Sequence, residues 1–128
     1  MMMMVLCNET PQGEESNMKK VECVVRRNKV DDVKAALHEA GILGMTVTDV
    51  RGVGRQKGRT DPPEGSDTVG FLPKVKLEMI VPDEMVQKAI DVIIASSRTG
   101  RFGDGKIFVY PVEQVIRIRT GETGVSAV

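Results

Sequence analysis

The chain has 128 residues, with 18 basic and 18 acidic side chains and therefore no formal net charge. This length suits one domain with a modest hydrophobic core. Zero net charge argues against a general nucleic-acid binder, which needs excess cations to neutralise phosphates. Tryptophan is absent and aromatic residues are few, so a stacking platform for single-stranded nucleic acid is poorly supplied. We expect no direct binding of nucleic acid.

The first 17 residues differ from the rest of the chain. They are largely polar after residue 7 and contain turn formers, so residues 1–17 are expected to form a disordered N-terminal leader. They lack the basic start of a signal peptide, and no apolar run reaches the roughly 18 residues of a membrane span. Cys7 and Cys23 are expected to be reduced thiols rather than a disulfide. These features predict a cytoplasmic protein.

The next part of the chain alternates strand and helix patterns. The short, β-branched run 21–25 predicts a buried strand. Apolar residues recur at helical spacing over 30–40, and Gly41 is expected to end that helix. Residues 45–53 predict a second strand. Residues 54–73 are rich in glycine, proline and charge and predict a long surface loop, a kind of segment that often carries function.

The second half repeats this order. Residues 74–79 alternate apolar and charged side chains and predict a third strand. Asp83 is expected to cap a second helix, which has a wide apolar stripe and ends at Gly100. Residues 107–112 predict a fourth strand, and residues 115–120 predict a short fifth.

This order predicts an α+β, ferredoxin-like βαββαβ sandwich as a single domain over residues 18–128. Both helices should cover one face of a four-stranded sheet. Because the strands also carry valine, isoleucine and methionine for the other face, we expect self-association to cover that face.

The most informative stretch is residues 98–106, RTGRFGDGK, with three glycines and three cations. Glycine lets backbone amides approach a ligand, and inward amides beside a lysine form an anion site. The stretch fits G-x-x-x-x-G-K, but a P-loop runs from strand to helix and has Ser or Thr after the lysine, where this chain has Ile107. Arg117 and Arg119 share one face if the fifth strand forms. Polyphosphate is the simplest common ligand; a glycine turn with solvated charges is the alternative.

A second cationic segment, RGVGRQKG, spans residues 51–58. Its spacing does not fit the dinucleotide-binding fingerprint. Its amides and cations suit a small anion such as a carboxylate, and Gln56 offers an oxygen to a metal or a hydrogen bond. A turn that enters the long loop is an equally good interpretation.

No catalytic set is visible. His38 is the only histidine and lies within a helix pattern. Asp31 and Asp32 suit the start of that helix, where acidic side chains favour the dipole. Ser96 and Ser97 have no paired base. We therefore expect a protein that is not an enzyme; a nucleotide hydrolase on this fold would lack a base and a nucleophile.

Taken together, these residues resemble the PII signal-transduction family (nitrogen regulatory protein PII). The resemblance covers nearly everything from Met18 to Glu122. It rests on stretches that read MKKVE at 18–22, VDDVKAAL at 30–37, GILGMTVTDV at 41–50, GVGRQKG at 52–58, FLPKVK at 71–76, TGRFGDGKIF at 99–108 and VIRIRTGE at 115–122.

The resemblance implies a homotrimer with ATP or ADP bound in clefts between neighbouring subunits. It also implies 2-oxoglutarate bound through Mg²⁺ chelated with the ATP phosphates, and a T-loop, about 54–73, that contacts a membrane transporter or a metabolic enzyme. The implied nucleotide contacts are Thr46, Gly54, Arg55, Gln56, Ile80, Gly103, Asp104, Gly105, Lys106, Arg117 and Arg119. The implied 2-oxoglutarate contacts are Gln56, Lys57, Gly58, Lys74 and Gly103, with Gln56 also a metal ligand.

One departure from the family pattern and one alternative ligand class remain open. Many relatives carry a tyrosine near the T-loop tip that is uridylylated, whereas this loop has none; Ser66 is a candidate modification site, although a solvated serine is the simpler interpretation. Divergent relatives sense bicarbonate, ADP or AMP in carbon metabolism. Gln56, Lys57 and Lys74 favour 2-oxoglutarate over those effectors.

Overall fold

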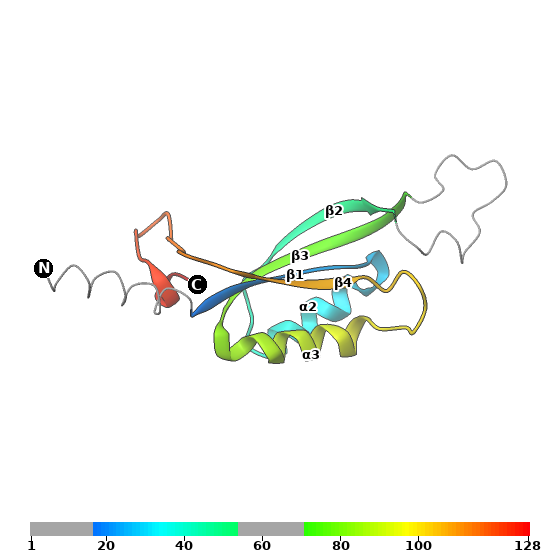
Figure 1. The fold of residues 1–128 in the computed structure, drawn as a ribbon, viewed down its shortest axis with the longest axis horizontal. Helices are drawn as coiled ribbons and strands as arrows, with labels where there is room; N and C mark the ends of the chain where they lie inside the picture. Colours follow the sequence, from blue (N-terminus) through cyan, green and yellow to red (C-terminus); the bar gives the residue numbers. More distant parts are fainter. Residues whose placement is uncertain (1–16, 54–70) are drawn as a thin grey trace, which may run out of the picture.

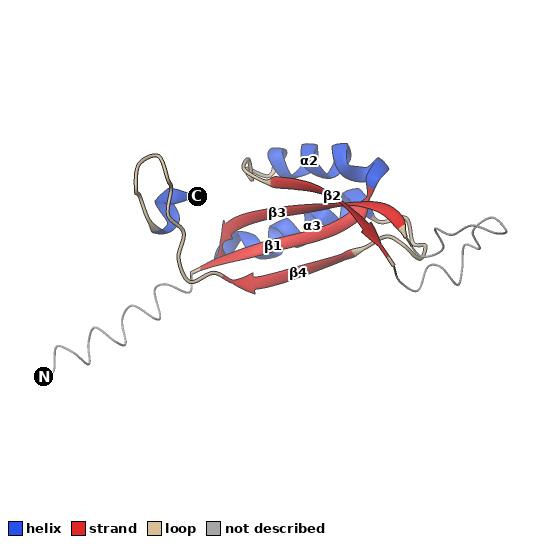
Figure 2. Cartoon of the chain, turned by 90° about the horizontal axis from the view of Figure 1, so that it is seen from above, coloured by secondary structure: helices blue, strands red, loops and turns tan. Residues whose placement is uncertain are grey.

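The computed structural model describes residues 17–53 and 71–128, which form one antiparallel sheet with two helices on one of its faces (Figures 1 and 2). The strands are in the spatial order β2-β3-β1-β4. The elements are β1 (Met18–Arg26), α2 (Val30–Glu39), β2 (Thr46–Gly52), β3 (Leu72–Pro82), α3 (Val86–Ser97) and β4 (Lys106–Pro111), with short 3-10 turns at Arg27–Lys29, Asp83–Met85 and Gly124–Ala127. This arrangement confirms the predicted ferredoxin-like α+β fold.

The core lies between the sheet and the two helices. Alternate residues of the central strands point to the helices, because side chains on a strand alternate between faces. The fully buried members include Val21 and Cys23 of β1, Leu77 of β3, Leu37 of α2 and Ile93 of α3. Cys23 is a free thiol, and its burial raises the pKa of the thiol to about 11. The expectation of a reduced thiol is met at Cys23; Cys7 lies outside the described residues.

The opposite face of the sheet is more polar than the sequence suggested. Strand pairing places Lys20, Glu22, Glu78 and Tyr110 together on this face. The Lys20 ammonium lies 3.0 Å from Glu78, 3.6 Å from Glu22 and 4.8 Å from the centre of the Tyr110 ring. This lysine offsets the repulsion of two glutamates that face each other on neighbouring strands. The same register places Ile80 and Phe108 on this face, and Phe108 is 41% exposed. The face is therefore mixed in polarity, and the expected self-association stays a prediction.

Two predictions about helix ends have different outcomes. Gly41 follows α2 with a φ of 94°, a left-handed conformation that suits glycine and confirms the predicted end. Asp83, by contrast, caps no helix: it begins a 3-10 turn, and its carboxylate accepts a hydrogen bond of 2.7 Å from Lys19. Asp31 and Asp32 lie in the first turn of α2, where no side chain caps the helix, so their contribution is through the dipole alone.

The predicted fifth strand is wrong. In residues 115–120 only Ile116 forms a β-bridge, to Thr123, and residues 118–120 are a turn. The chain folds back on itself here because the Arg117 amide bonds to the Glu122 carbonyl and the Gly121 amide to the Arg117 carbonyl. This local hairpin satisfies backbone groups that a strand at the sheet edge would have left for a neighbour.

The long loop is shorter at its end than predicted. β3 begins at Leu72, which pairs with Gly52, and Pro73 pairs with Arg51, so the last two residues of 54–73 belong to the sheet. The greater part of that loop, and residues 1–16, lie outside the described residues. Asn17 is described, and its carbonyl accepts the Asp83 amide at 2.9 Å. Within 17–53 and 71–128, no helix is long and apolar enough to cross a membrane.

Candidate functional site

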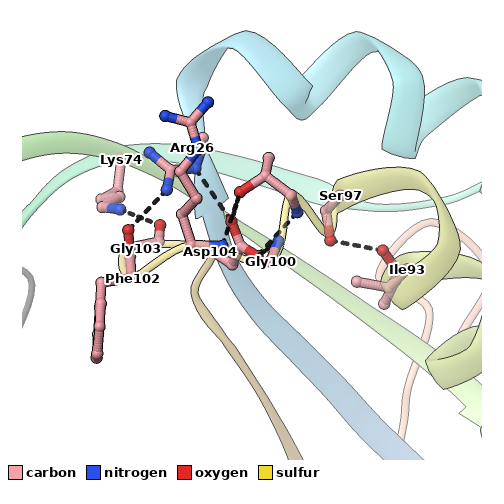
Figure 3. A network of polar contacts seen from close by, with 10 residues as sticks. Arg26, Lys74, Ile93, Ser97, Gly100, Phe102, Gly103 and Asp104 are labelled. Atoms are coloured by element: carbon pink, nitrogen blue, oxygen red, sulfur yellow. Dashed lines mark hydrogen bonds and ion pairs between the residues drawn. The ribbon is translucent and has the colours of Figure 1, made fainter.

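The turn between α3 and β4, residues 98–105, is organised around the carboxylate of Asp104 (Figure 3). One carboxylate oxygen accepts the amides of Thr99 and Gly100, both at 2.8 Å. The other oxygen accepts the Thr99 hydroxyl, which in turn accepts the Arg101 amide at 3.2 Å. The first amides of the turn are therefore occupied by an internal anion. The sequence predicted an anion site made of backbone amides. In the structure, the Asp104 carboxylate of the same turn occupies the amides of Thr99 and Gly100.

Two cations from the sheet hold the same turn. Arg26, the last residue of β1, donates its Nε to Asp104 at 3.2 Å and an Nη2 to the Phe102 carbonyl at 2.7 Å. Lys74 of β3 is buried and donates to the Gly103 carbonyl at 2.5 Å. Burial, and secondarily the nearby Arg26, lowers the pKa of the Lys74 ammonium. Figure 3 shows both side chains directed at the turn.

A cavity of about 620 Å³ opens beside this turn. Its wall combines exposed cations, Arg101 and Lys106, with apolar surface from Val53 and Phe102. Gly103, Asp104, Gly105 and the buried Lys74 also line it. A wall with positive charge, accessible glycine backbone and an aromatic ring suits an anion that carries a flat or apolar group. The structure thus brings Lys74, Gly103, Asp104, Gly105 and Lys106 together as predicted.

Thr46 and Ile80 belong to a different cavity, of about 570 Å³. This cavity is bounded by the loop before β2, the end of β3, and Val115 and Val128 of the C-terminal segment. Ile80 is six residues beyond Lys74 on β3, a separation of about 20 Å along an extended strand. Within one chain, then, the predicted nucleotide contacts form two separate groups.

Arg117 and Arg119 lie at the same end of the sheet as this second group (Figure 1) but do not line its cavity. Both follow β4, and Figure 1 shows the C-terminal segment at the opposite end of the sheet from the turn between α3 and β4. Arg117 forms an ion pair of 2.9 Å with Glu122, whereas Arg119 is exposed within the turn 118–120. Because no strand forms here, the predicted alternation that put both guanidinium groups on one face does not apply.

The remaining predicted site residues lie outside the described part of the chain. These are Gly54, Arg55, Gln56, Lys57, Gly58 and Ser66. In the described ranges, no group of three or more His, Cys, Asp or Glu residues is placed to hold a metal ion. His38 is exposed on α2, and its Nε2 lies 3.2 Å from the Leu43 carbonyl, as expected of a helix-surface histidine.

Sequence reasoning missed Arg26 and Thr99 as members of this site. Arg26 is 78 positions from Asp104 along the chain, and no local motif links the two. Thr99 offered a weak signal, since a hydroxyl residue a few positions before an aspartate often bonds within a turn.

The Asp104 contacts predict how stability responds to acid. Burial alone would raise the pKa of the Asp104 carboxyl, but hydrogen bonds from Thr99, Gly100 and Arg26 outweigh it and hold that pKa well below its usual range. Such a group stabilises the fold above its unfolded pKa of about 3.9, and this stabilisation is lost as the pH falls towards the folded pKa. We expect Asp104→Asn to be less stable than the original chain at pH 7, with the gap narrowing below about pH 4.

Urea unfolding at a series of pH values from neutral to acid measures that gap directly. Asp91→Asn, on the exposed face of α3 where Asp91 accepts one hydrogen bond from Gln87, is the matched control. A gap for Asp104→Asn that stays constant down to the lowest pH would show that the carboxylate's charge is not what the turn requires.

The fold and the turn together define a single ferredoxin-like domain with a cationic glycine turn at one end of its sheet. Residues 18–122 match the family described as "Nitrogen regulatory protein P-II". The chain is 60% identical over 112 residues to a nitrogen regulatory protein P-II of Nostoc punctiforme and 58% identical to one of Rhodobacter capsulatus, covering 87% of this chain and all of each relative. The chain therefore belongs to the P-II family of nitrogen regulatory proteins.

A solved structure agrees with this assignment. The crystal structure of Arabidopsis thaliana PII bound to citrate superposes with a TM-score of 0.73 at 43% sequence identity, and the match covers 88% of this chain and 94% of that one. Family membership confirms the resemblance drawn from the sequence. It also places the chain among signal-transduction regulators that act on other proteins.

Proposed function

We propose that this chain is a sensor that binds ATP or ADP and, with Mg-ATP, 2-oxoglutarate, and that it regulates a nitrogen-assimilation transporter or enzyme through its T-loop. The observation that carries the proposal is the cavity beside the glycine turn. Two exposed cations line it together with Gly103, Asp104 and Gly105; cations beside glycines suit phosphate oxygens, and the Asp104 carboxylate is already bonded to Arg26 and to the turn's own amides. Catalysis is not needed for this role, because phosphate number alone can be the signal.

Each site is proposed to be shared between two copies of the chain in a homotrimer. Within one chain the two groups of predicted nucleotide contacts lie apart, because Lys74 is near one end of β3 and Ile80 is near the other. A second copy could bring its Thr46 and Ile80 cavity, with Arg117 and Arg119, against the first copy's turn. Such a cleft would enclose a nucleotide between a phosphate end and an apolar end.

The carboxylate ligand is proposed to sit at Lys74. An ammonium has three donors, so Lys74 can bond a carboxylate while it keeps the Gly103 carbonyl. The relative from Arabidopsis thaliana binds citrate, also a small carboxylate. The family resemblance adds Gln56, Lys57 and Gly58.

Magnesium fits this proposal as a companion of the phosphates. The Asp104 carboxylate is already saturated by Arg26, Thr99 and Gly100, so the described turn offers cations and amides rather than a free anionic ligand. The ion would bridge phosphate and ketoacid oxygens and thereby couple the two ligands. Gln56 would complete its oxygen ligands, and Lys106 would neutralise the remaining phosphate charge.

Calorimetry tests the coupled mechanism. We expect 2-oxoglutarate to bind tightly when Mg-ATP is present and weakly with Mg-ADP or with no nucleotide, because only the γ-phosphate completes the shared site. Equal 2-oxoglutarate affinity in all three conditions would contradict coupling. A protein that binds bicarbonate, ADP or AMP but not 2-oxoglutarate would point to a divergent sensor of carbon metabolism.

A further inference from the structure

Arg26 stands out among the charged residues near the turn because it makes two contacts with it and none with the cavity. Its side chain is 27% exposed, and it is absent from the described residues that line the cavity beside the turn. Its guanidinium joins the Asp104 carboxylate to the Phe102 carbonyl. A ligand in that cavity would therefore be reached by the turn but not by Arg26 itself.

The turn requires such support because glycines leave it conformationally free. Gly103 and Gly105 have φ values of 100° and 108°; in an unsupported segment these glycines would sample many other conformations. Ordering them only when a ligand arrives would lower affinity by the entropy lost at that step. Contacts that fix the turn beforehand remove this cost.

Arg26 can supply that order for geometric reasons. It is the last residue of β1, and it pairs with Lys74 of β3 within the sheet. Its planar guanidinium offers separate donors to two acceptors at once, which a lysine ammonium on a flexible stem does poorly. Arg26 fixes the positions of Phe102 and Asp104, and Gly103 between them is fixed by Lys74.

We propose that Arg26 is the positioning residue of the phosphate-binding turn: it holds residues 99–105 in the binding conformation through Asp104 and the Phe102 carbonyl, without touching the ligand. The inference rests on the proposed nucleotide site. It also reassigns Asp104, from a nucleotide contact to the internal anion around which the turn folds. Arg26 and Asp104 compensate each other's charge, so the pair adds order rather than net attraction.

Three variants test this role: Arg26→Ala, Arg26→Lys and the control Arg27→Ala. Arg27 is the neighbouring cation, but its side chain is 60% exposed and its one ion pair, to Asp49, is 3.7 Å long. Titration with Mg-ATP should give an affinity roughly tenfold lower for Arg26→Ala, the loss expected for hydrogen bonds to a charged group. The affinity of Arg26→Lys for Mg-ATP should lie between those of Arg26→Ala and the original chain, and Arg27→Ala should bind Mg-ATP like the original chain.

Hydrogen exchange of the ligand-free protein gives a second, independent readout. The amides of Thr99 and Gly100 should exchange faster in Arg26→Ala than in the original chain, and at the original rate in Arg27→Ala. In both variants the amides of β1 and β3 should keep their protection. This separates a local positioning role from general destabilisation. If Arg26→Ala does not fold, Arg26→Lys carries both measurements.

Several results would overturn the proposal. Full affinity in Arg26→Lys would mean that only the charge matters, and unchanged Mg-ATP affinity in Arg26→Ala would remove Arg26 from the site. Unaltered exchange at Thr99 and Gly100 would show that Arg26 does not order the turn. Failure of the original chain to bind Mg-ATP would instead refute the nucleotide site, and with it the proposal, whatever the exchange result.

Discussion

Replacing Gly105 with alanine is expected to lower the free energy of unfolding by about 3 kcal/mol or more and to abolish the proposed nucleotide binding. A Cβ at this position would lie 1.7 Å from the Val24 carbonyl oxygen and 2.9 Å from its carbon. These are backbone atoms of β1, which cannot rotate away as a side chain could. The φ of 108° adds the strain of a conformation that residues with a side chain rarely adopt. Relief would require β4 to move off β1 at the point where Lys106 pairs with Val24.

Gly41→Ala is the matched control for this prediction. Gly41 has a similar φ, 94°, but a Cβ there would meet nothing within 4 Å. Gly41→Ala should therefore lower the free energy of unfolding only by the strain of the left-handed conformation, about 1–2 kcal/mol. Urea unfolding of both variants at one protein concentration gives the difference. If the two variants lose equal stability, contact with β1 is not what requires glycine at 105.

Local pattern in the sequence was enough for the fold. Alternation of apolar residues in β1 and β3 fixed which side chains enter the core, and Gly41 marked the end of α2. The same kind of pattern failed at 115–120, where the alternating Ile116 and Ile118 suggest a strand. Backbone hydrogen bonds to Glu122 and Gly121 stabilise a hairpin there instead, and alternation alone does not distinguish a strand from a short hairpin.

The candidate site was predictable only in part. Glycine content and cations identified the turn at 98–106, because conformational freedom and charge are properties of the residues themselves. Its internal order was not predictable, since Asp104 finds its partner in Arg26 on a distant strand. The division of the predicted nucleotide contacts into two groups agrees with the clefts between subunits that the family resemblance implied, but the residues alone did not show it, because it depends on the direction in which β3 and β4 run.

The separation of Lys106 from Arg119 within one chain predicts that replacing either residue weakens Mg-ATP binding. Lys106 begins β4, and Pro111, at its other end, is roughly 17 Å away along an extended strand. Arg119 lies further on, in the C-terminal hairpin. If both contact one nucleotide, as proposed, they come from different copies of the chain. Lys106→Ala and Arg119→Ala should each weaken Mg-ATP binding at least tenfold, since each removes one charged contact of about 1.5–3 kcal/mol.

Mixed oligomers of these two variants should recover tight binding. A cleft has no defect when one chain, carrying Arg119→Ala, supplies Lys106 and its neighbour, carrying Lys106→Ala, supplies Arg119. Random mixing of equal amounts of the two variants should make about one cleft in four of this kind. Calorimetry of co-refolded mixtures should therefore show a minor class of sites with the original affinity. Co-refolding Lys106→Ala with itself is the control and should show none. A mixture without tight sites, from subunits shown to have exchanged, would mean that each chain binds its nucleotide alone, and the hairpin at 115–123 would then have to reach its own chain's turn.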